Sequence, residues 1–324
     1  MNLNKIIKPS VPLRILYIVL GFAVWTVVYI GTFYERGVGF DQWSAGLFDV
    51  SYFYKNLVSL VFTLINGALL LQLFNRFSFV NTRTFVPAFV FGLLMAVWYT
   101  SHALFLSHIA LFLFICALFC FFNMSEKPTP EKSFLGSLLI ACASLLVNPL
   151  ILILPACWLG FVVLRCFSFR IFLASVLGVL AVGLLYAAAN YVIFAPKFFS
   201  WHDLFYLDFY LGFCIRYLQL PLQIYIGSLL VLFFITIFGT YADFHKQANN
   251  IRRNINFILI LLVCFIALFA VQRDFKGTFF PFIALCFSVF ASHLFSAKTS
   301  KFYTGLFFIF IIINAGFVAY LFIR

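Results

Sequence analysis

The chain alternates from end to end between long apolar runs and short polar turns. Apolar runs of roughly 15–22 residues are long enough to cross the hydrocarbon core of a bilayer as helices. The pattern therefore predicts an all-α fold, a polytopic transmembrane helical bundle of about eleven spans, within a range of roughly ten to twelve. The spans are expected at 15–33, 57–74, 86–101, 104–123, 134–148, 150–165, 171–194, 222–240, 255–271, 278–295 and 304–323.

One apolar run, over 134–166, is too long for a single helix, and Asn148 followed by Pro149 interrupts it. Proline ends or kinks a helix because it lacks an N–H and clashes with the preceding turn. We therefore expect a hairpin of two short helices that turns at Asn148 and Pro149.

A second interruption, over 196–221, is rich in aromatic residues but also carries charge. Ser200 followed three residues later by Asp203 has the spacing of a capping box, which indicates the start of a helix. If this helix crossed the membrane, the later basic residues would change sides, against the positive-inside rule. We therefore predict an amphipathic helix over about 200–220 that lies on the outer membrane surface.

The composition is typical of a membrane domain and excludes an ordinary soluble one. Hydrophobic residues make up 65% of the chain, charged residues make up 9%, and the mean hydropathy is +1.12. A soluble fold carries about a quarter charged residues. No linker divides the apolar runs, so residues 1–324 are predicted to form a single integral membrane domain. The net charge of +12 comes from scattered basic residues without a basic stripe, so nucleic acid is not an expected partner.

The scattered Lys and Arg residues instead predict the topology. A basic N-terminal stretch precedes the first apolar run, and no cleavage site follows, which indicates an uncleaved signal anchor. The alternating turns then place about twice as many basic residues on the cytoplasmic side as on the outer side. The prediction is a multi-pass protein of a bacterial inner membrane, with a cytoplasmic N-terminus and a periplasmic C-terminus.

The first outer turn, over 34–55, holds three of the nine acidic residues of the chain, Glu35, Asp41 and Asp49. Apolar and aromatic residues recur in this turn at helical spacing, at Phe40, Trp43, Leu47, Val50 and Tyr54. This stripe predicts a further amphipathic helix on the outer surface, over about 40–54.

The acidic residues of this turn are candidates for catalysis. Asp41 and Asp49 lie about 12 Å apart along a helix axis, so they cannot share one metal ion or act as a paired acid and base. Asp41, closer to the first span, is the preferred catalytic residue, with Asp49 and Glu35 as alternates, and it would need a partner from another loop. A solvated or helix-capping role for Asp41 remains the alternative.

A very short outer turn between the ninth and tenth spans contains Arg273 and Lys276. Such a pair at the membrane surface can hold a lipid phosphate, the Arg by its planar fork and the Lys as a point charge. The alternative is that both side chains only snorkel to ordinary headgroups.

Histidines are also concentrated on the predicted outer side. His102 and His108 flank the turn between the third and fourth spans, and His202 adjoins Asp203. These residues are candidates for supporting roles at an outward-facing site. Inside the spans, polar residues are few and no row of carboxylates occurs, which disfavours a proton-coupled transporter.

Several segments follow one another in a suggestive order: the acidic outer turn, LLLQLFNRFSFVNTRTFVPAFVFGLL, the hairpin GSLLIACASLLVNPLILILPACW and the late RDFKGTFFPFIAL. This order resembles the transmembrane half of the C-type glycosyltransferases, a superfamily that uses polyprenyl-phosphate sugars. The resemblance implies a functional acidic residue at Asp41, although Gln42 follows where the family has a second acidic residue. The chain is also similar to phenylalanine-rich inner-membrane proteins of Bacteroidota.

Three functional hypotheses follow. The first is a glycosyltransferase-like protein that handles a lipid-linked sugar on the periplasmic face, with membrane lipids and a polyprenyl-phosphate-linked sugar as partners. In it, Asp41 acts as a base or as the ligand of a divalent metal ion. The second is a non-catalytic membrane subunit or scaffold of an envelope assembly or secretion complex, with other membrane subunits as partners. The third is a transporter.

Overall fold

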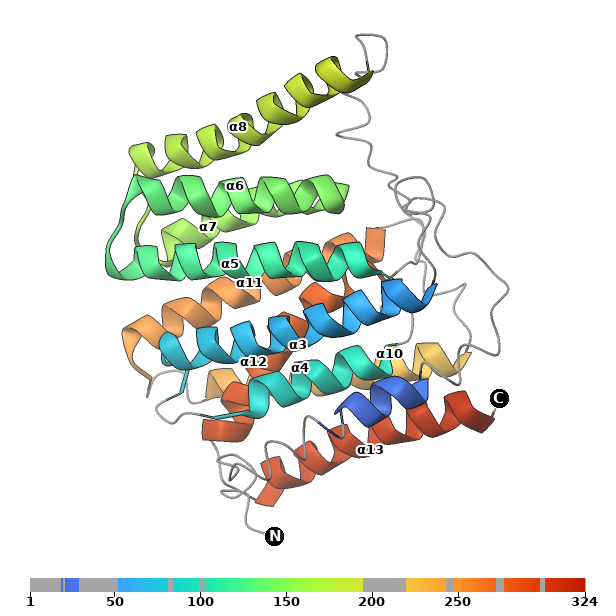
Figure 1. Cartoon of the computed structure of the whole chain (residues 1–324). Coiled ribbons are helices and arrows are strands. Elements are labelled where there is room, and N and C mark those ends of the chain that lie inside the picture. Colours follow the sequence, from blue (N-terminus) through green and yellow to red (C-terminus); the bar gives the residue numbers. More distant parts are fainter. Residues whose placement is uncertain are drawn as a thin grey trace.

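The computed structural model describes residues 19, 21–28, 52–80, 84–98, 102, 104–194, 220–242, 247–271, 277–297 and 301–323. Within these ranges the chain is helical and forms no β-strand, which confirms the predicted fold class. The helices lie side by side (Figure 1). They are α3 (Tyr52–Arg76), α4 (Val86–Val97), α5 (Phe105–Glu126), α6 (Pro130–Leu146), the 3-10 helix η2 (Asn148–Ile153), α7 (Leu154–Val163), α8 (Phe169–Phe194), α10 (Leu220–Ala242), α11 (Asn249–Val271), α12 (Phe280–Ala297) and α13 (Lys301–Ile323).

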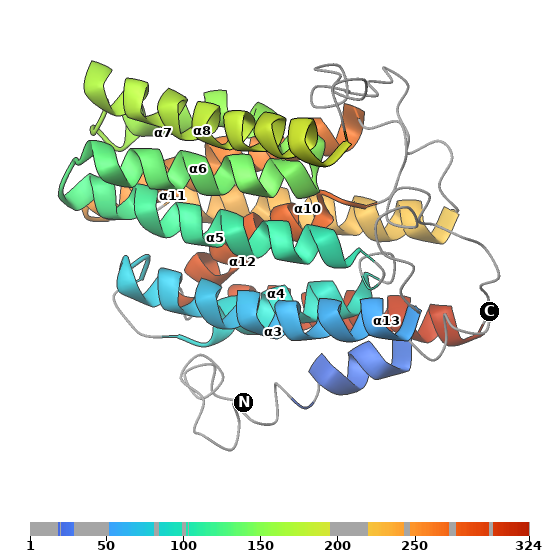
Figure 2. The ribbon, with the colours of Figure 1, turned by 45° about the horizontal axis from the view of Figure 1, so that its top comes forward.

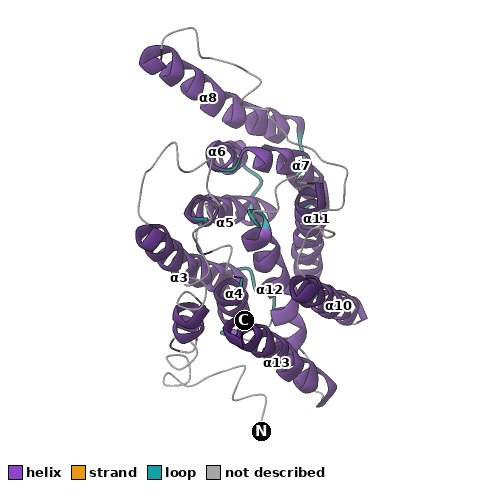
Figure 3. Cartoon of the chain, turned by 90° about the vertical axis from the view of Figure 1, so that its right-hand side faces the viewer, coloured by secondary structure: helices purple, strands orange, loops and turns teal. Residues whose placement is uncertain are grey.

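The helices form two layers, seen in the end-on view of Figure 3. One layer contains α8, α6, α5 and α3 in that order, with α4 beside α3, and the other contains α7, α11, α12 and α10. α12 joins the layers because it packs against α4 and α5 as well as α10 and α11. α13 packs against α10, α4 and α12, and a short helix at 21–28 lies beside the start of α3 (Figure 2).

Among the described helices, six are long and apolar enough to cross a bilayer. These are α3, α5, α8, α10, α11 and α13. The helices α4, η2–α7 and α12 are apolar but shorter. Every predicted span overlaps one of the described helical segments, so the apolar runs were correctly assigned to helices.

The predicted hairpin is present between α6 and α7. α6 ends at Leu146, η2 begins at Asn148, and α7 then runs in the opposite direction to α6 (Figure 1) and packs mainly against α11. Pro149 lies in the first turn of η2, where the N–H that proline lacks would have no partner within the helix. Prolines also stand in the first turns of α4, α6 and α7, so this residue marks helix starts along the chain.

The two predicted surface helices fall mainly outside the described residues, over 40–51 and 200–219. Where they reach described residues, the predicted boundaries are wrong. Residues 52–54 already belong to α3, and Leu220 is the first residue of α10. An aromatic stripe on a surface helix and the lipid-facing side of a spanning helix have the same composition, so the sequence pattern could not separate them.

Phenylalanine fills much of the interior, often in edge-to-face pairs. The Phe114 and Phe265 rings meet 5.3 Å apart at 80°, and the Phe122 and Phe257 rings meet 5.5 Å apart at 79°. This geometry places the positive edge of one ring against the negative face of the other. The many phenylalanines therefore link α5 to α11 at the centre of the bundle.

Basic residues gather at one end of the bundle, which we call the basic end. Here α3, α5 and α7 end and α6, α8 and α11 begin, on the left in Figure 1. The side chains at this end are Arg76, Lys127, Lys132, Arg165, Arg170, Arg252 and Arg253. Lys55, near the start of α3, lies at the opposite end, which we call the far end.

Candidate functional site

Most of the predicted site residues lie outside the described residues. These are Glu35, Asp41, Asp49, His202, Asp203, Arg273 and Lys276. His102 and His108 are described, and both are fully buried. They belong to a cluster towards the far end, which we call the polar junction and which consists of Trp25, Asn56, Thr63, Asn66, His102 and His108.

Trp25 lies at the centre of one half of the junction. Its indole N–H donates to Asn56 Oδ1 at 2.8 Å, which ties the helix at 21–28 to α3 across 31 residues of sequence. Its ring stacks on the imidazole of His102, with the centroids 3.8 Å apart and the planes at 16°. One side chain thus connects the first helical segment, α3 and the stretch between α4 and α5.

His108 holds the other half together, between α5 and α3. Thr63 donates its hydroxyl proton to the Ser59 carbonyl at 2.7 Å, so its oxygen can only accept from His108 Nδ1, 3.3 Å away. This geometry places a proton on His108 Nδ1. The Asn66 amide donates to the His108 carbonyl at 3.0 Å, which adds a second link between the helices.

The side chain of His102 caps the C-terminal end of α4. Its Nε2 lies 3.2 Å from the Met95 carbonyl oxygen and 3.1 Å from the Ala96 carbonyl oxygen. Carbonyl oxygens only accept, so Nε2 must carry a proton that the two share. The last four carbonyls of a helix have no N–H of the same helix to accept, and His102 reaches two of them.

The junction is an uncommon feature for an apolar bundle. Ionisable side chains inside a membrane protein are costly and usually serve a function. Ser59 Oγ and Asn66 Oδ1 are buried there and have no hydrogen-bond partner among the described residues. Within those same ranges no group of three or more His, Cys, Asp and Glu side chains could hold a metal ion. The contacts of the two histidines link helices.

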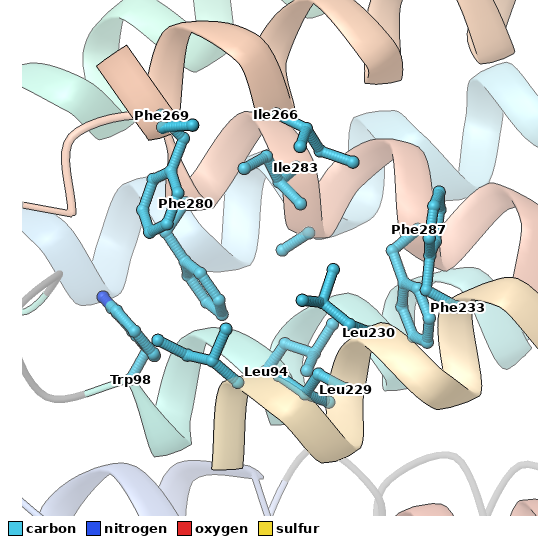
Figure 4. A pocket seen from close by; sticks show the side chains of 13 residues that line it. Leu94, Trp98, Leu229, Leu230, Phe233, Ile266, Phe269, Phe280, Ile283 and Phe287 are labelled. Atoms are coloured by element: carbon cyan, nitrogen blue, oxygen red, sulfur yellow. The ribbon is translucent and has the colours of Figure 1, made fainter. Parts of the chain in front are cut away.

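A second feature is an apolar groove between α10 and α11, with α12 as its floor and the end of α4 as one wall (Figure 4). Its volume is about 210 Å³. The lining residues are Leu94, Trp98, Ile226, Leu229, Leu230, Phe233, Ile266, Phe269, Ala270, Phe280, Ile283, Ala284 and Phe287. Aliphatic and aromatic carbon makes up nearly all of this surface, so the groove favours a hydrocarbon over water.

The arrangement of three helices leaves the groove open at the side. α10 and α11 both pack on α12, which keeps them apart. Leu230 of α10 lines the groove and is still 38% exposed, so the groove reaches the outer surface of the bundle. In a bilayer this surface faces lipid, and a hydrocarbon chain can enter sideways without crossing water.

Trp98 brings the groove and the polar junction close together. It is the residue at which α4 ends, directly after the turn whose carbonyls His102 caps. Its ring stacks on Phe280, with the centroids 4.1 Å apart and the planes at 11°, and both rings line the groove. The last turn of α4 is therefore shared by the two features.

The sequence indicated the histidines but not the groove. A histidine between two apolar runs is a visible exception, whereas Leu230 and Ile226 look like any other apolar residues of a membrane helix. Only the packing of α10 and α11 on α12 distinguishes groove-lining residues from lipid-facing ones. No protein-family model, curated protein or solved structure matches this chain.

Proposed function

We propose that this chain is a multi-pass protein of a bacterial inner membrane that handles a lipid-linked sugar on the periplasmic face, in a glycosyltransferase-like manner. The observation that carries the proposal is the groove of α10, α11 and α12. It is apolar throughout and opens to the side, which suits the hydrocarbon chain of a lipid-linked substrate. The chain would lie in the groove while its phosphate and sugar remain at the membrane surface.

The distribution of charge supports the orientation. Cytoplasmic ends of spanning helices carry an excess of Lys and Arg, so the basic end is assigned to the cytoplasm and the far end to the periplasm. The groove is lined by the middle of α10, the last turns of α11 and the first half of α12, and the lining residues of α11 and α12 lie towards the far end. A chain bound there would place its headgroup on the periplasmic side.

The chemical part of the proposal rests on the sequence. Asp41 is assigned as the base or as the ligand of a divalent metal ion, and Arg273 and Lys276 are assigned to the lipid phosphate. Arg273 follows the groove residue Ala270 by three positions, and Lys276 precedes the groove residue Phe280 by four. This short separation along the chain favours a phosphate site next to the groove.

Photo-crosslinking tests the lipid site directly. The protein in lipid nanodiscs is irradiated with a polyprenyl phosphate that carries a diazirine on its chain, and the labelled peptides are mapped. We expect labels on α10, α11 and α12. Leu230→Trp fills the groove and should reduce the labelling about tenfold. The hydrocarbon chain then buries less apolar surface, and the lost binding free energy exceeds about 1.4 kcal/mol.

Val231→Trp is the matched control. Val231 is the next residue of α10, is well exposed and does not line the groove, so its substitution should leave the labelling unchanged. Equal labelling of the parent and both variants, or labels spread evenly over all helices, would show general contact with lipid and remove the support for the proposal.

The catalytic assignment has its own test. Asp41→Asn removes a charge but keeps the size of the side chain, and it should alter the lipid-linked sugar profile of cells as strongly as deletion of the whole protein. An unchanged profile in Asp41→Asn beside a changed one in the deletion would favour a non-catalytic membrane subunit. Partner proteins that co-purify with the chain in mild detergent would then identify the complex.

A further inference from the structure

The end of α4 is held in place by a residue that does not belong to the helix. His102 Nε2 donates to the carbonyls of Met95 and Ala96, the third-to-last and second-to-last residues of α4. Carbonyl oxygens left without a donor in apolar surroundings are costly, so this bond favours the helical position of the last turn.

His102 is itself fixed from the opposite side. Its ring stacks on Trp25 at 3.8 Å, and Trp25 is hydrogen-bonded to Asn56 of α3 at 2.8 Å. All three side chains are buried. His102 therefore transmits the position of α3 and the helix at 21–28 to the end of α4.

The residue after this last turn forms a wall of the groove. The backbone N–H of Trp98 donates to the Leu94 carbonyl at 3.1 Å, which continues the helical hydrogen-bond pattern to Trp98. The indole then packs face to face on Phe280 of α12 at 4.1 Å. If the last turn of α4 unwinds, this ring loses its alignment and the groove loses its shape at that wall.

We propose that His102 is a positioning residue for the groove, acting through the last turn of α4 on Trp98. The inference rests on the proposed function, because it assigns a purpose to the shape of the groove. His102 does not line the groove. Its Nε2–H keeps Trp98 stacked on Phe280, so that a hydrocarbon chain meets a preformed surface rather than one that must be ordered on binding.

Two amide substitutions of His102 separate positioning from simple packing. The amide nitrogen of Gln reaches about as far as Nε2, whereas the amide of Asn ends near the place of Nδ1. His102→Gln therefore keeps a donor for Met95 and Ala96, and His102→Asn lacks it. Both are neutral, polar and smaller than histidine, and both lose the stack on Trp25.

The readout is the near-ultraviolet circular dichroism of Trp98, taken as the difference between each protein and its Trp98→Phe version. We expect His102→Gln to keep the Trp98 signal and His102→Asn to lose most of it. Labelling of the groove by the diazirine-bearing polyprenyl phosphate should fall about five- to tenfold in His102→Asn, the usual effect of one lost hydrogen bond, and be retained in His102→Gln.

A variant of the other histidine controls for general destabilisation. His108→Gln disturbs the contact of α5 with α3 but leaves the His102 bonds to Met95 and Ala96 in place, so the Trp98 signal should persist. An equal Trp98 signal in His102→Asn and His102→Gln would overturn the inference. Absence of groove labelling in the parent protein would contradict the proposed function alone, because the Trp98 signal is measured without any lipid probe.

Discussion

The hydroxyl oxygens of Ser137 and Ser175 lie 2.6 Å apart and share a hydrogen bond across the contact of α6 and α8. Trp158 of α7 donates its indole N–H to the same Ser175 oxygen at 2.9 Å. α8 is thus attached to the bundle by hydroxyl groups and by close approach of small residues, as is usual where helices associate in lipid. Its outer side exposes a row of leucines, so this attachment decides where α8 lies.

Gly178 lies at a close approach of α8 to α6, and a side chain there should loosen α8. A methyl group at Gly178 would lie 2.5 Å from the Phe134 carbonyl oxygen, a backbone atom that cannot move aside. We expect Gly178→Ala to lower the free energy of unfolding in detergent micelles by about 1–3 kcal/mol, as overpacking usually does. Titration with sodium dodecyl sulfate, followed by circular dichroism, measures this change.

Gly183 provides the control on the same helix. A methyl group there meets no atom within 4 Å apart from those of its chain neighbours and of its own helix backbone, so Gly183→Ala should be neutral or stabilising by up to about 1 kcal/mol through helix propensity. If the two alanine variants shift the transition equally, Gly178 does not set the distance between α6 and α8.

Tyr225 and Asn314 should depend on one another. The Tyr225 hydroxyl donates to Asn314 Oδ1 at 2.9 Å between α10 and α13, and both side chains are buried. Tyr225→Phe keeps the ring stacked on Phe317, 4.2 Å away, but leaves the amide oxygen without this donor. We expect Tyr225→Phe to lower the free energy of unfolding by about 1–3 kcal/mol.

Asn314→Leu completes the double-mutant cycle for this pair. With both polar groups replaced, neither member of the Tyr225–Asn314 bond is left without the other, so Tyr225→Phe with Asn314→Leu should cost less than the two single losses together. Strictly additive losses in the same detergent titration would show that the two side chains are not coupled.

These two contacts show what a single sequence can reveal about this fold. The apolar run at 104–123 predicted α5, and Asn148 with Pro149 predicted the turn after α6, because length and proline act locally. The partner of each helix depends instead on distant pairs such as Tyr225 and Asn314, 89 residues apart. No periodicity in either helix identifies the other.

The candidate sites differ in the same way. His102 and His108 could be selected because ionisable residues beside apolar spans are few. That Trp25 stacks on His102 and bonds to Asn56 could not be predicted, because an indole and an amide are common near membrane surfaces. The groove was missed for a simpler reason: Leu230 faces the groove and Val231 faces away, and both are branched aliphatic residues.

Cys166 should resist thiol reagents although it lies in the turn between α7 and α8. It is buried, its thiol donates to the Phe161 carbonyl at 3.5 Å, and burial raises its pKa to about 11. Because only the thiolate reacts, about one molecule in a thousand is reactive at pH 8. We expect alkylation by iodoacetamide to accelerate about tenfold per pH unit up to pH 10. A rate that levels off below pH 9 would contradict the raised pKa.

The low reactivity of Cys166 permits a test of the topology at the neighbouring position. Ser168 is exposed in the same turn, between Arg165 and Arg170, so Ser168→Cys supplies an exposed thiol at the basic end. Tyr54, 58% exposed near the start of α3, supplies one at the far end as Tyr54→Cys. Because the basic end is assigned to the cytoplasm, an impermeant maleimide should label Tyr54→Cys in cells with a permeabilised outer membrane. Ser168→Cys should be labelled only after the inner membrane is opened. The reverse order would invert the topology and place the groove towards the cytoplasmic side of the membrane.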